Sequence, residues 1–286
     1  MKYGLHLPNF GAFGDIHQLI EFAKIAEDAG WDGFFLWDHL LFCEHDKNPH
    51  VDPWIALSAI AVQTERMKIG AMITAIARRR PWKLARETVS LQNLSNGRLI
   101  LGAGLGDPVE WEFETFHEES DAKIRAQKLD EGLEILTRLW TGETVNYEGT
   151  HYQVTDATFL PTPIQAIPIW TAGYFPNKAP INRASRFHGM FPGQDGNLVP
   201  ENIKMLRETI QSKRKDNSPF DIVVSGQTKG KNDISEVSQY KDAGATWWLE
   251  DISPLRLGLG WGDLWKPWDV DALKARIIEG TPRLNI

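Results

Sequence analysis

Residues 67–103, MKIGAMITAIARRRPWKLARETVSLQNLSNGRLILGA, hold the pattern that decides the fold of this chain. The stretch opens with Met67 to Thr74, a short apolar run of the kind that forms a buried strand. Pro81 to Leu94 follows with helical spacing, and Asn96-Gly97 after it is typical of a helix end. Arg98 to Ala103 is apolar again. This order predicts two parallel strands joined by a helix.

The same alternation continues on both sides of this stretch. A helix is expected at Asp15 to Ala29, and Asp52-Pro53 opens another, because a capping residue followed by proline favours a helix start. Later helices should begin near Asn177, Pro200, Asp233 and Asp269. The remaining strands are expected at Lys2–Leu7, Asp32–Trp37, Ile167–Ala172, His188–Phe191, Phe220–Ser225 and Ala245–Glu250. Eight such units predict a (β/α)8 TIM barrel, and a doubly wound sheet of fewer strands is the alternative.

One segment, residues 107–166, departs from this alternation. It contains an acidic loop, a long helix predicted at Lys123 to Trp140, and a hairpin around Asn146 to Gly149. We interpret it as an insertion after strand four that covers the mouth of the barrel. Residues 1–286 then form a single domain.

Composition narrows the class of protein. The net charge of −7 over 286 residues argues against a nucleic-acid partner, which requires clustered positive charge. No apolar run approaches the roughly 18 residues that span a bilayer, and residues 1–14 do not resemble a secretory signal. Cys43 is the only cysteine, which suits a reducing compartment. We therefore expect a soluble cytoplasmic protein without nucleic-acid or membrane partners.

Candidate site residues follow from the barrel rule that active sites lie at the carboxyl ends of the strands. Asp38 and His39 end strand two, where a carboxylate and an imidazole can orient a substrate and move a proton. In the alternative interpretation, Asp38 caps the following loop and His39 is a partly buried ring. His6 ends strand one, and a glycine-rich loop follows strand four with Gly104, Leu105, Gly106 and Asp107. Its spacing is not that of a dinucleotide-binding loop, so it is expected to line a ring or a substrate.

Two further patterns allow more than one interpretation. Arg78, Arg79 and Arg80 could bind a phosphate-rich ligand, although such a run is more often a solvated face. Twelve tryptophans are many, and some could line an apolar pocket from loops. Those expected in loops are Trp111, Trp261, Trp265 and Trp268. The histidines show no paired metal-binding spacing, so no metal site is predicted.

Several of these segments together resemble the luciferase-like flavin-dependent monooxygenase superfamily. The resemblance is carried by Gly4-Leu5-His6-Leu7-Pro8, Asp38-His39, residues 67–102 and Ile167-Pro168-Ile169-Trp170-Thr171-Ala172-Gly173. It runs over most of the chain in the same order. It implies a barrel of the bacterial-luciferase type that binds reduced FMN or an 8-hydroxy-5-deazaflavin.

The resemblance also places the cofactor. The flavin ring would rest against the end of strand three, at Ala71, Met72, Ile73 and Thr74, over a non-proline cis peptide at Met72-Ile73. The flavin phosphate would lie near the end of strand five, at Ala172, Gly173 and Tyr174. His6, Gly104, Leu105 and Gly106 complete the candidate cofactor contacts.

The choice between the two cofactors stays open at this point. Asp38-His39 and the acidic Asp107 match deazaflavin-dependent members, and Leu105 stands where luciferases proper use an arginine for the FMN phosphate. Against the deazaflavin, Leu41-Phe42-Cys43 lacks the tryptophan that such dehydrogenases often have after the histidine. FMN members are also more widespread.

The resemblance implies one of two activities. The first is a monooxygenase that oxidises a small apolar organic substrate with oxygen and reduced FMN. A separate flavin reductase would supply the reduced FMN. The alternative is a deazaflavin-dependent hydride-transfer enzyme with His39 as base, Asp107 as acid and Asp38 beside them. A homodimer is expected through helices Pro53–Thr64 and Pro81–Leu94. Two rivals are a non-catalytic flavin-binding protein and a hydrolase with a metal held by Asp38, His39 and His6.

Overall fold

The computed structural model describes residues 1–44, 46–193, 198–260, 263–264 and 266–282. Within them, nine strands form one sheet whose neighbours all run parallel, in the order β3-β2-β1-β11-β10-β9-β8-β5-β4. The strands are β1 (Lys2–Leu7), β2 (Gly33–Leu36), β3 (Lys68–Ala71), β4 (Thr74–Ala75), β5 (Leu101–Gly104), β8 (Ile169–Tyr174), β9 (Gly189–Gly193), β10 (Asp221–Gly226) and β11 (Trp247–Asp251).

The two ends of this sheet meet and close a barrel. The Ile69 amide donates to the Arg98 carbonyl at 3.1 Å, and the Ile100 amide donates to the Ile69 carbonyl at 2.9 Å. Strands β3 and β4 are two halves of one barrel strand, separated by a cis peptide between Met72 and Ile73. The cis peptide expected at this position is thereby confirmed. The eight-stranded barrel is also confirmed, in place of the open doubly wound sheet.

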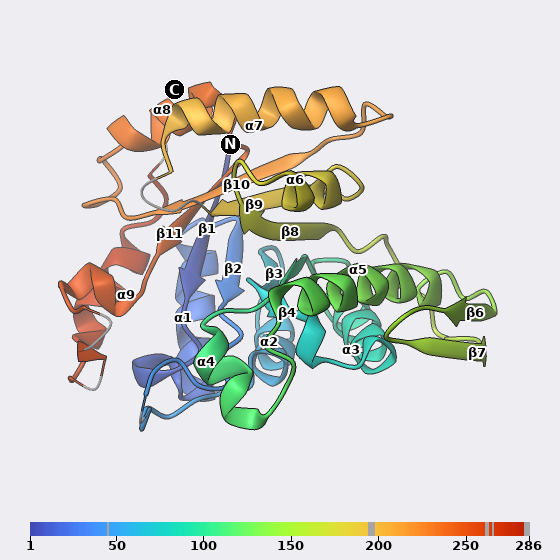
Figure 1. Cartoon of the computed structure of the whole chain (residues 1–286). Helices are drawn as coiled ribbons and strands as arrows, with labels where there is room; N and C mark the ends of the chain where they lie inside the picture. The colour runs from blue at the N-terminus through green and yellow to red at the C-terminus, as the bar shows by residue number, and fades with distance from the viewer. Residues whose placement is uncertain (45, 194–197, 261–262, 265, 283–286) are drawn as a thin grey trace.

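Helices cover the outside of the barrel (Figure 1). They are α1 (Ile16–Asp28), α2 (Pro53–Ala61), α3 (Pro81–Leu94), α5 (Ala122–Leu139), α6 (Lys178–Ala184), α7 (Pro200–Lys213), α8 (Ser235–Ala243) and α9 (Val270–Ile278). Side chains of Asp15, Asp52, Asp121 and Asp269 accept backbone N–H groups at four of their N-termini, which explains why these starts were predictable. Among the described helices, none has the length and apolar character needed to cross a bilayer.

Two apolar layers hold the barrel together. The larger one lies between the strands and the surrounding helices. The smaller one contains Phe35, Trp170, Trp247, Met72 and further apolar side chains. The rings of Phe35, Trp170 and Trp247 contact one another, with centroids 5.2 to 5.7 Å apart. Since these three residues lie on β2, β8 and β11, the aromatic cluster joins strands from different parts of the barrel.

The segment predicted as an insertion contains one regular barrel element. Helix α5 follows β5 and packs against α3, so it is the fourth barrel helix. The additions are α4 (Val109–Glu112), the short 3₁₀ helix η3 (Glu114–Phe116), and the hairpin of β6 (Val145–Glu148) and β7 (Gln153–Ala157). Figure 1 shows the hairpin at the far end of α5, remote from α4. The residues around α4 and the first turn of α5 border the mouth of the barrel.

Candidate functional site

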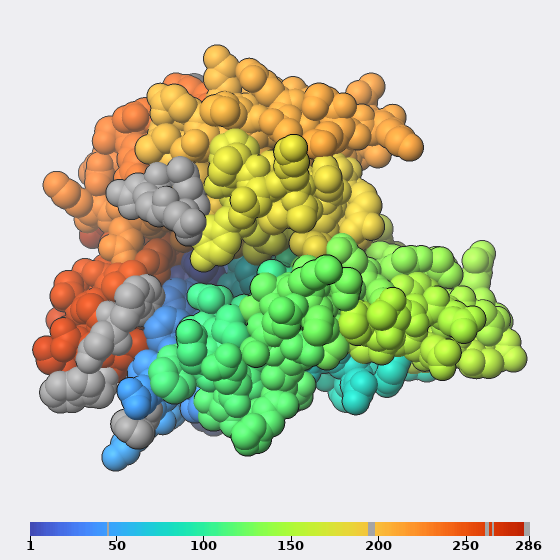
Figure 2. All heavy atoms as spheres, viewed as in Figure 1, coloured from blue at the N-terminus to red at the C-terminus, as the bar shows by residue number. Residues whose placement is uncertain are grey.

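A cavity of about 1170 Å³ opens where the carboxyl ends of several strands meet. Figure 2 shows a hollow there, between the green segment with α4 and α5 and the yellow segment with β8 and α6. The candidate residues that line it are His6, Asp38, His39, Met72, Ile73, Gly104, Leu105, Gly106, Asp107, Ala172, Gly173 and Tyr174. Ala71 and Thr74 are fully buried and are not among the lining residues. The structure therefore brings together residues from five strand ends that the sequence analysis selected separately.

His6 lies in the deep part of this cavity, beside Met72. Its Nε2 is 2.9 Å from the Met72 carbonyl oxygen. Because a carbonyl only accepts, Nε2 carries the proton and donates. Burial lowers the pKa of His6, so the ring is neutral near pH 7. The centroids of the Trp37 and Phe191 rings lie 5.5 and 5.6 Å from that of the His6 ring. Both rings line the cavity and make this end of it apolar.

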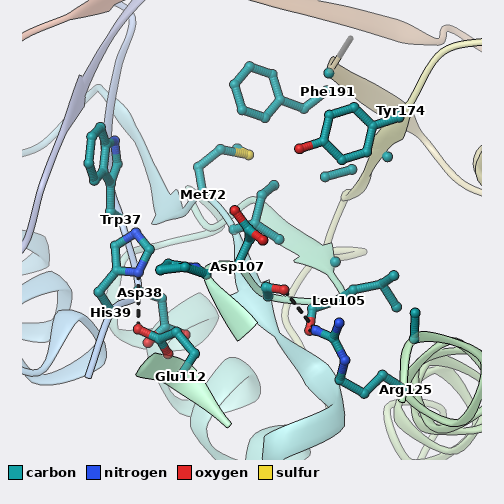
Figure 3. A pocket seen from close by; sticks show the side chains of 18 of the residues that line it. Trp37, Asp38, His39, Met72, Leu105, Asp107, Glu112, Arg125, Tyr174 and Phe191 are labelled. Carbon is teal, nitrogen blue, oxygen red and sulfur yellow. Dashed lines mark hydrogen bonds and ion pairs between the residues drawn. The ribbon is translucent and has the colours of Figure 1, made fainter. Parts of the chain in front are cut away.

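His39 is held at both its main chain and its ring. The Asn9 side chain accepts from the His39 amide at 3.1 Å and donates to its carbonyl at 2.9 Å. On the ring, Nδ1 lies 3.0 Å from Oε1 of Glu112, a residue of α4 (Figure 3). Burial lowers the pKa of His39 to about 4, so the imidazole is neutral near pH 7. A neutral ring whose Nδ1 faces a carboxylate has its free lone pair on Nε2.

Asp38 is buried in a cluster of charges. Its carboxylate accepts from Arg79 through both oxygens at 2.9 Å and from Arg78 at 3.0 Å. Arg78 also forms an ion pair with Glu112. Two arginines and two carboxylates therefore balance one another beneath His39. Arg78 and Arg79 are therefore neither a solvated face nor free phosphate ligands, whereas Arg80, the third arginine of the run, is exposed as the solvated-face interpretation expects.

Asp107 lies at the mouth of the cavity with its carboxyl directed inward (Figure 3). Burial and the neighbouring Glu110 raise the pKa of Asp107, whereas Arg125 and His39 act in the opposite direction. Asp107 and His39 are thus close enough for the charge of each to influence the pKa of the other. A carboxyl with a raised pKa next to a neutral imidazole is a usual acid–base pairing.

Arg125 of α5 supplies a further cation, which is buried. Its Nη1 donates to the carbonyls of Leu105 and Gly106, at 3.2 and 2.9 Å, and the guanidinium lies 4.6 Å from the centroid of Phe113. The residue is 4% exposed, and its Nε has no hydrogen-bond partner among the described residues. No carboxylate of the described chain forms an ion pair with it. Arg125 is therefore suited to an anionic group of a bound molecule.

The glycines at the end of β5 and directly after it are required by the packing of the protein itself. A Cβ on Gly104 would lie 2.6 Å from Ile73, and one on Gly106 would lie 2.7 Å from Ala75 and 2.9 Å from Phe113. Gly106 also has a φ of +86°, which favours glycine. These residues still line the cavity with their main chain. Their lack of side chains, however, accommodates the broken strand β3–β4 and α4 rather than a ligand.

Among the residues that the sequence analysis missed are two charged contributors, Glu112 and Arg125. Neither follows a barrel strand directly, so the strand-end rule could not select them. The only available signal was their position in the segment expected to cover the mouth. Of the tryptophans considered, Trp111 lines the cavity, whereas Trp268 packs against Phe10 and Phe13. Trp261 and Trp265 lie outside the described residues.

Comparison with known proteins places the chain in a family. Residues 1–251 match the model of the luciferase-like monooxygenase family. The chain belongs to this family. Among curated relatives, it is 35% identical over 191 residues to an F420-dependent glucose-6-phosphate dehydrogenase of Microbacterium testaceum, covering 65% of this chain and 56% of that one. A protein of the same name from Amycolatopsis mediterranei is 33% identical over 54% of this chain and 46% of its own. The chain spans about half the length of these relatives.

Solved structures share the fold of this chain. An F420-dependent secondary alcohol dehydrogenase in complex with an F420-acetone adduct has a TM-score of 0.78 at 17% identity, with 98% of each chain covered. The EDTA monooxygenase of Chelativorans sp. BNC1 has a TM-score of 0.68 at 18% identity, covering 85% of this chain and 66% of that one. At such low identity these structures establish the fold alone.

Proposed function

We propose that this chain is a deazaflavin (F420)-dependent oxidoreductase that moves hydride between the cofactor and a small apolar alcohol or carbonyl compound. The observation that carries the proposal is the pairing of a neutral His39 with an Asp107 of raised pKa at one cavity. The curated relatives named above use F420, which supports the hydride-transfer alternative better than the oxygen-dependent monooxygenase that the sequence analysis put first.

The residues present fit such a cofactor. Met72, Ile73, Leu105 and Phe191 offer apolar surface for a flat ring system, and the cavity is large enough to hold one. Arg125, with its unsatisfied buried Nε, would hold a phosphate or carboxylate of the cofactor. The main chain of Ala172 and Gly173 and the side chain of Tyr174 border the same cavity from β8.

The chain would supply the proton transfers. When bound, the deazaflavin provides a carbon that accepts or releases a hydride. For alcohol oxidation, Nε2 of His39 accepts the hydroxyl proton as the hydride leaves the adjacent carbon. The Asp107 carboxyl, whose pKa is raised by burial and by Glu110, would be the proton donor on the side where the cofactor would lie. In the reverse direction, His39 returns its proton to the oxygen of the carbonyl substrate.

The surroundings of His39 favour an uncharged, apolar substrate. Trp37 and Phe42 contact its ring at 5.7 and 4.8 Å between centroids, and both line the cavity. The nearby cations Arg78 and Arg183 are paired, with Asp38 and Glu112 in one case and with Asp130 in the other. A phosphorylated sugar would have to break these pairs or compete with the cofactor for Arg125. We therefore place a small alcohol or ketone in this site.

Titration of the purified protein with F420 and separately with FMN tests the proposal. We expect F420 to bind, and its visible absorbance to fall when a secondary alcohol such as cyclohexanol is added. Tight FMN binding with oxygen uptake after reduction would instead support the monooxygenase, which needs a separate flavin reductase. Binding without turnover on an alcohol panel that includes glucose 6-phosphate would support a non-catalytic flavin-binding protein.

The hydrolase alternative has less support. Asp38 is occupied by two arginines and is not free to bind a metal. Among the described residues, no three His, Cys, Asp or Glu side chains gather in a way that could hold an ion.

We also propose a homodimer through α2 and α3. Large apolar side chains are exposed there without a covering element: Ile55 is 63% exposed, Val62 58% and Leu94 46%. A second copy of the chain would remove this surface from water.

A further inference from the structure

Glu112 contacts the imidazole of the proposed base although it lies far from it in sequence. The residue ends α4, and its side chain is only 1% exposed. Oε1 lies 3.0 Å from Nδ1 of His39 and accepts from the Leu40 amide at 2.9 Å. Oε2 pairs with Arg78. Both oxygens of this carboxylate therefore have partners in fixed directions.

We propose that Glu112 is a positioning residue that keeps His39 in the tautomer with the proton on Nδ1 and the lone pair of Nε2 open to the cavity. This inference rests on the function proposed above. A histidine can act as a base only through the nitrogen without a proton, and a carboxylate partner decides which nitrogen that is. Without Glu112, the neutral ring would be a mixture of the tautomer protonated on Nδ1 and the tautomer protonated on Nε2.

Arg78 makes the arrangement rigid. Its guanidinium is 6% exposed, and it donates to the Asp38 carbonyl at 2.7 Å and to the Asp38 carboxylate at 3.0 Å. The same side chain pairs with Glu112, so the carboxylate cannot rotate away from His39 without losing a buried ion pair. The contacts form a continuous series from Asp38 through Arg78 and Glu112 to Nδ1 of His39.

The variant Glu112→Gln gives a sharp prediction because an amide has one acceptor and one donor end. Arg78 will attract the amide oxygen more strongly than the Leu40 N–H does, since a buried guanidinium is charged and only donates, whereas the Leu40 N–H is neutral. The amide NH₂ then faces Nδ1 of His39, which must accept, and the proton moves to Nε2. The variant therefore places the wrong tautomer in the cavity while its side chain keeps nearly the same size.

Steady-state kinetics with F420 and an alcohol substrate provide the first measurement. We expect Glu112→Gln to lower kcat by about 10- to 100-fold, the range found when a carboxylate that orients a metal-bound histidine is lost. KM for the alcohol and Kd for F420 should stay within about threefold, because the contact serves proton transfer rather than binding. Glu112→Asp keeps the charge and should recover much of kcat. Glu114→Gln, an exposed neighbour on η3, is the matched control and should behave like the unaltered protein.

Nitrogen-15 NMR of the imidazole gives a readout that does not depend on turnover. The unaltered protein should show His39 with Nδ1 protonated, and Glu112→Gln should show Nε2 protonated. An unaltered protein with the proton on Nε2 would overturn the proposal, as would a Gln variant with undiminished kcat. If Glu112→Gln does not fold, the tautomer of the unaltered protein and the Asp variant decide the question. If the unaltered protein does not bind F420, the proposed function is refuted but the role of Glu112 is not, because the tautomer is measured without the cofactor.

Discussion

Replacing Asp38 with asparagine removes one of the two carboxylates that balance Arg78 and Arg79. The Asp38 side chain is 1% exposed and accepts three side-chain hydrogen bonds from these arginines. Asparagine has nearly the same shape but offers one acceptor oxygen, and its NH₂ group would face a guanidinium. The three charges that remain in the cluster would then sum to +1 in a buried setting.

The expected loss of stability follows from that excess charge. Removing one partner of a buried ion pair usually costs about 3–5 kcal/mol. An unfolding entropy of about 2.1 cal/mol/K per residue gives about 0.6 kcal/mol/K for 286 residues. The melting temperature of Asp38→Asn should therefore fall by roughly 5–8 °C.

Thermal unfolding followed by circular dichroism at pH 7 tests this estimate. Asp242→Asn is a suitable control, because Asp242 is exposed on α8 and its replacement should change stability by less than about 0.5 kcal/mol. A fall of less than about 2 °C for Asp38→Asn would refute the view that Asp38 mainly anchors the arginines.

Three further predictions concern the cofactor, the pH response and the assembly. Arg125→Gln should weaken F420 binding by about 10- to 100-fold in a fluorescence titration, since a charge-assisted hydrogen bond is lost, and an unchanged Kd would remove Arg125 from the cofactor site. The pKa of His39 is about 4 in the folded state, against an ordinary value of 6.5. Because the unfolded chain therefore binds this proton more readily, the free energy of unfolding should fall as the pH drops from 6.5 toward 4. Urea midpoints at pH 7 and pH 4.5 should accordingly differ less in His39→Gln, and an equal difference would contradict the lowered pKa. In sedimentation velocity, Ile55→Glu combined with Val62→Glu should yield monomers whereas Met205→Glu on α7 should not, and a monomeric unaltered protein would exclude the dimer.

The barrel was predictable because parallel strands are buried on both faces and therefore appear as short apolar runs. Helix starts were equally clear, since Asp52-Pro53 or Asp269 leaves a local signal in the capping residue itself. The interruption of strand three was not visible in the residue pattern, because Met72 and Ile73 continue an apolar run without a polar or glycine residue between them. The family resemblance alone indicated it.

The electrostatic partners of the site residues could not be predicted from the sequence. Glu112 and His39 are 73 positions apart, and nothing local to either residue indicates that they meet. Arg78 and Arg79 lie in a run of arginines that local composition assigns to solvent. Their burial depends on Asp38, which lies 40 residues or more away in the chain. Compensating charges that lie so far apart in the sequence follow no periodic pattern, so their pairing cannot be predicted from the residue order.

The segment that connects β5 to α5 matters when parts of the chain are exchanged between relatives, whether by evolution or by design. This one short segment carries both Asp107 and Glu112, so the proposed acid and the group that orients the base would be exchanged together in any transplanted loop. A graft that introduced only part of it would leave His39 with a foreign partner. We expect chimeras between relatives to keep their activity when the segment is moved whole with Arg78, and to lose it when the cut falls between Asp107 and Glu112.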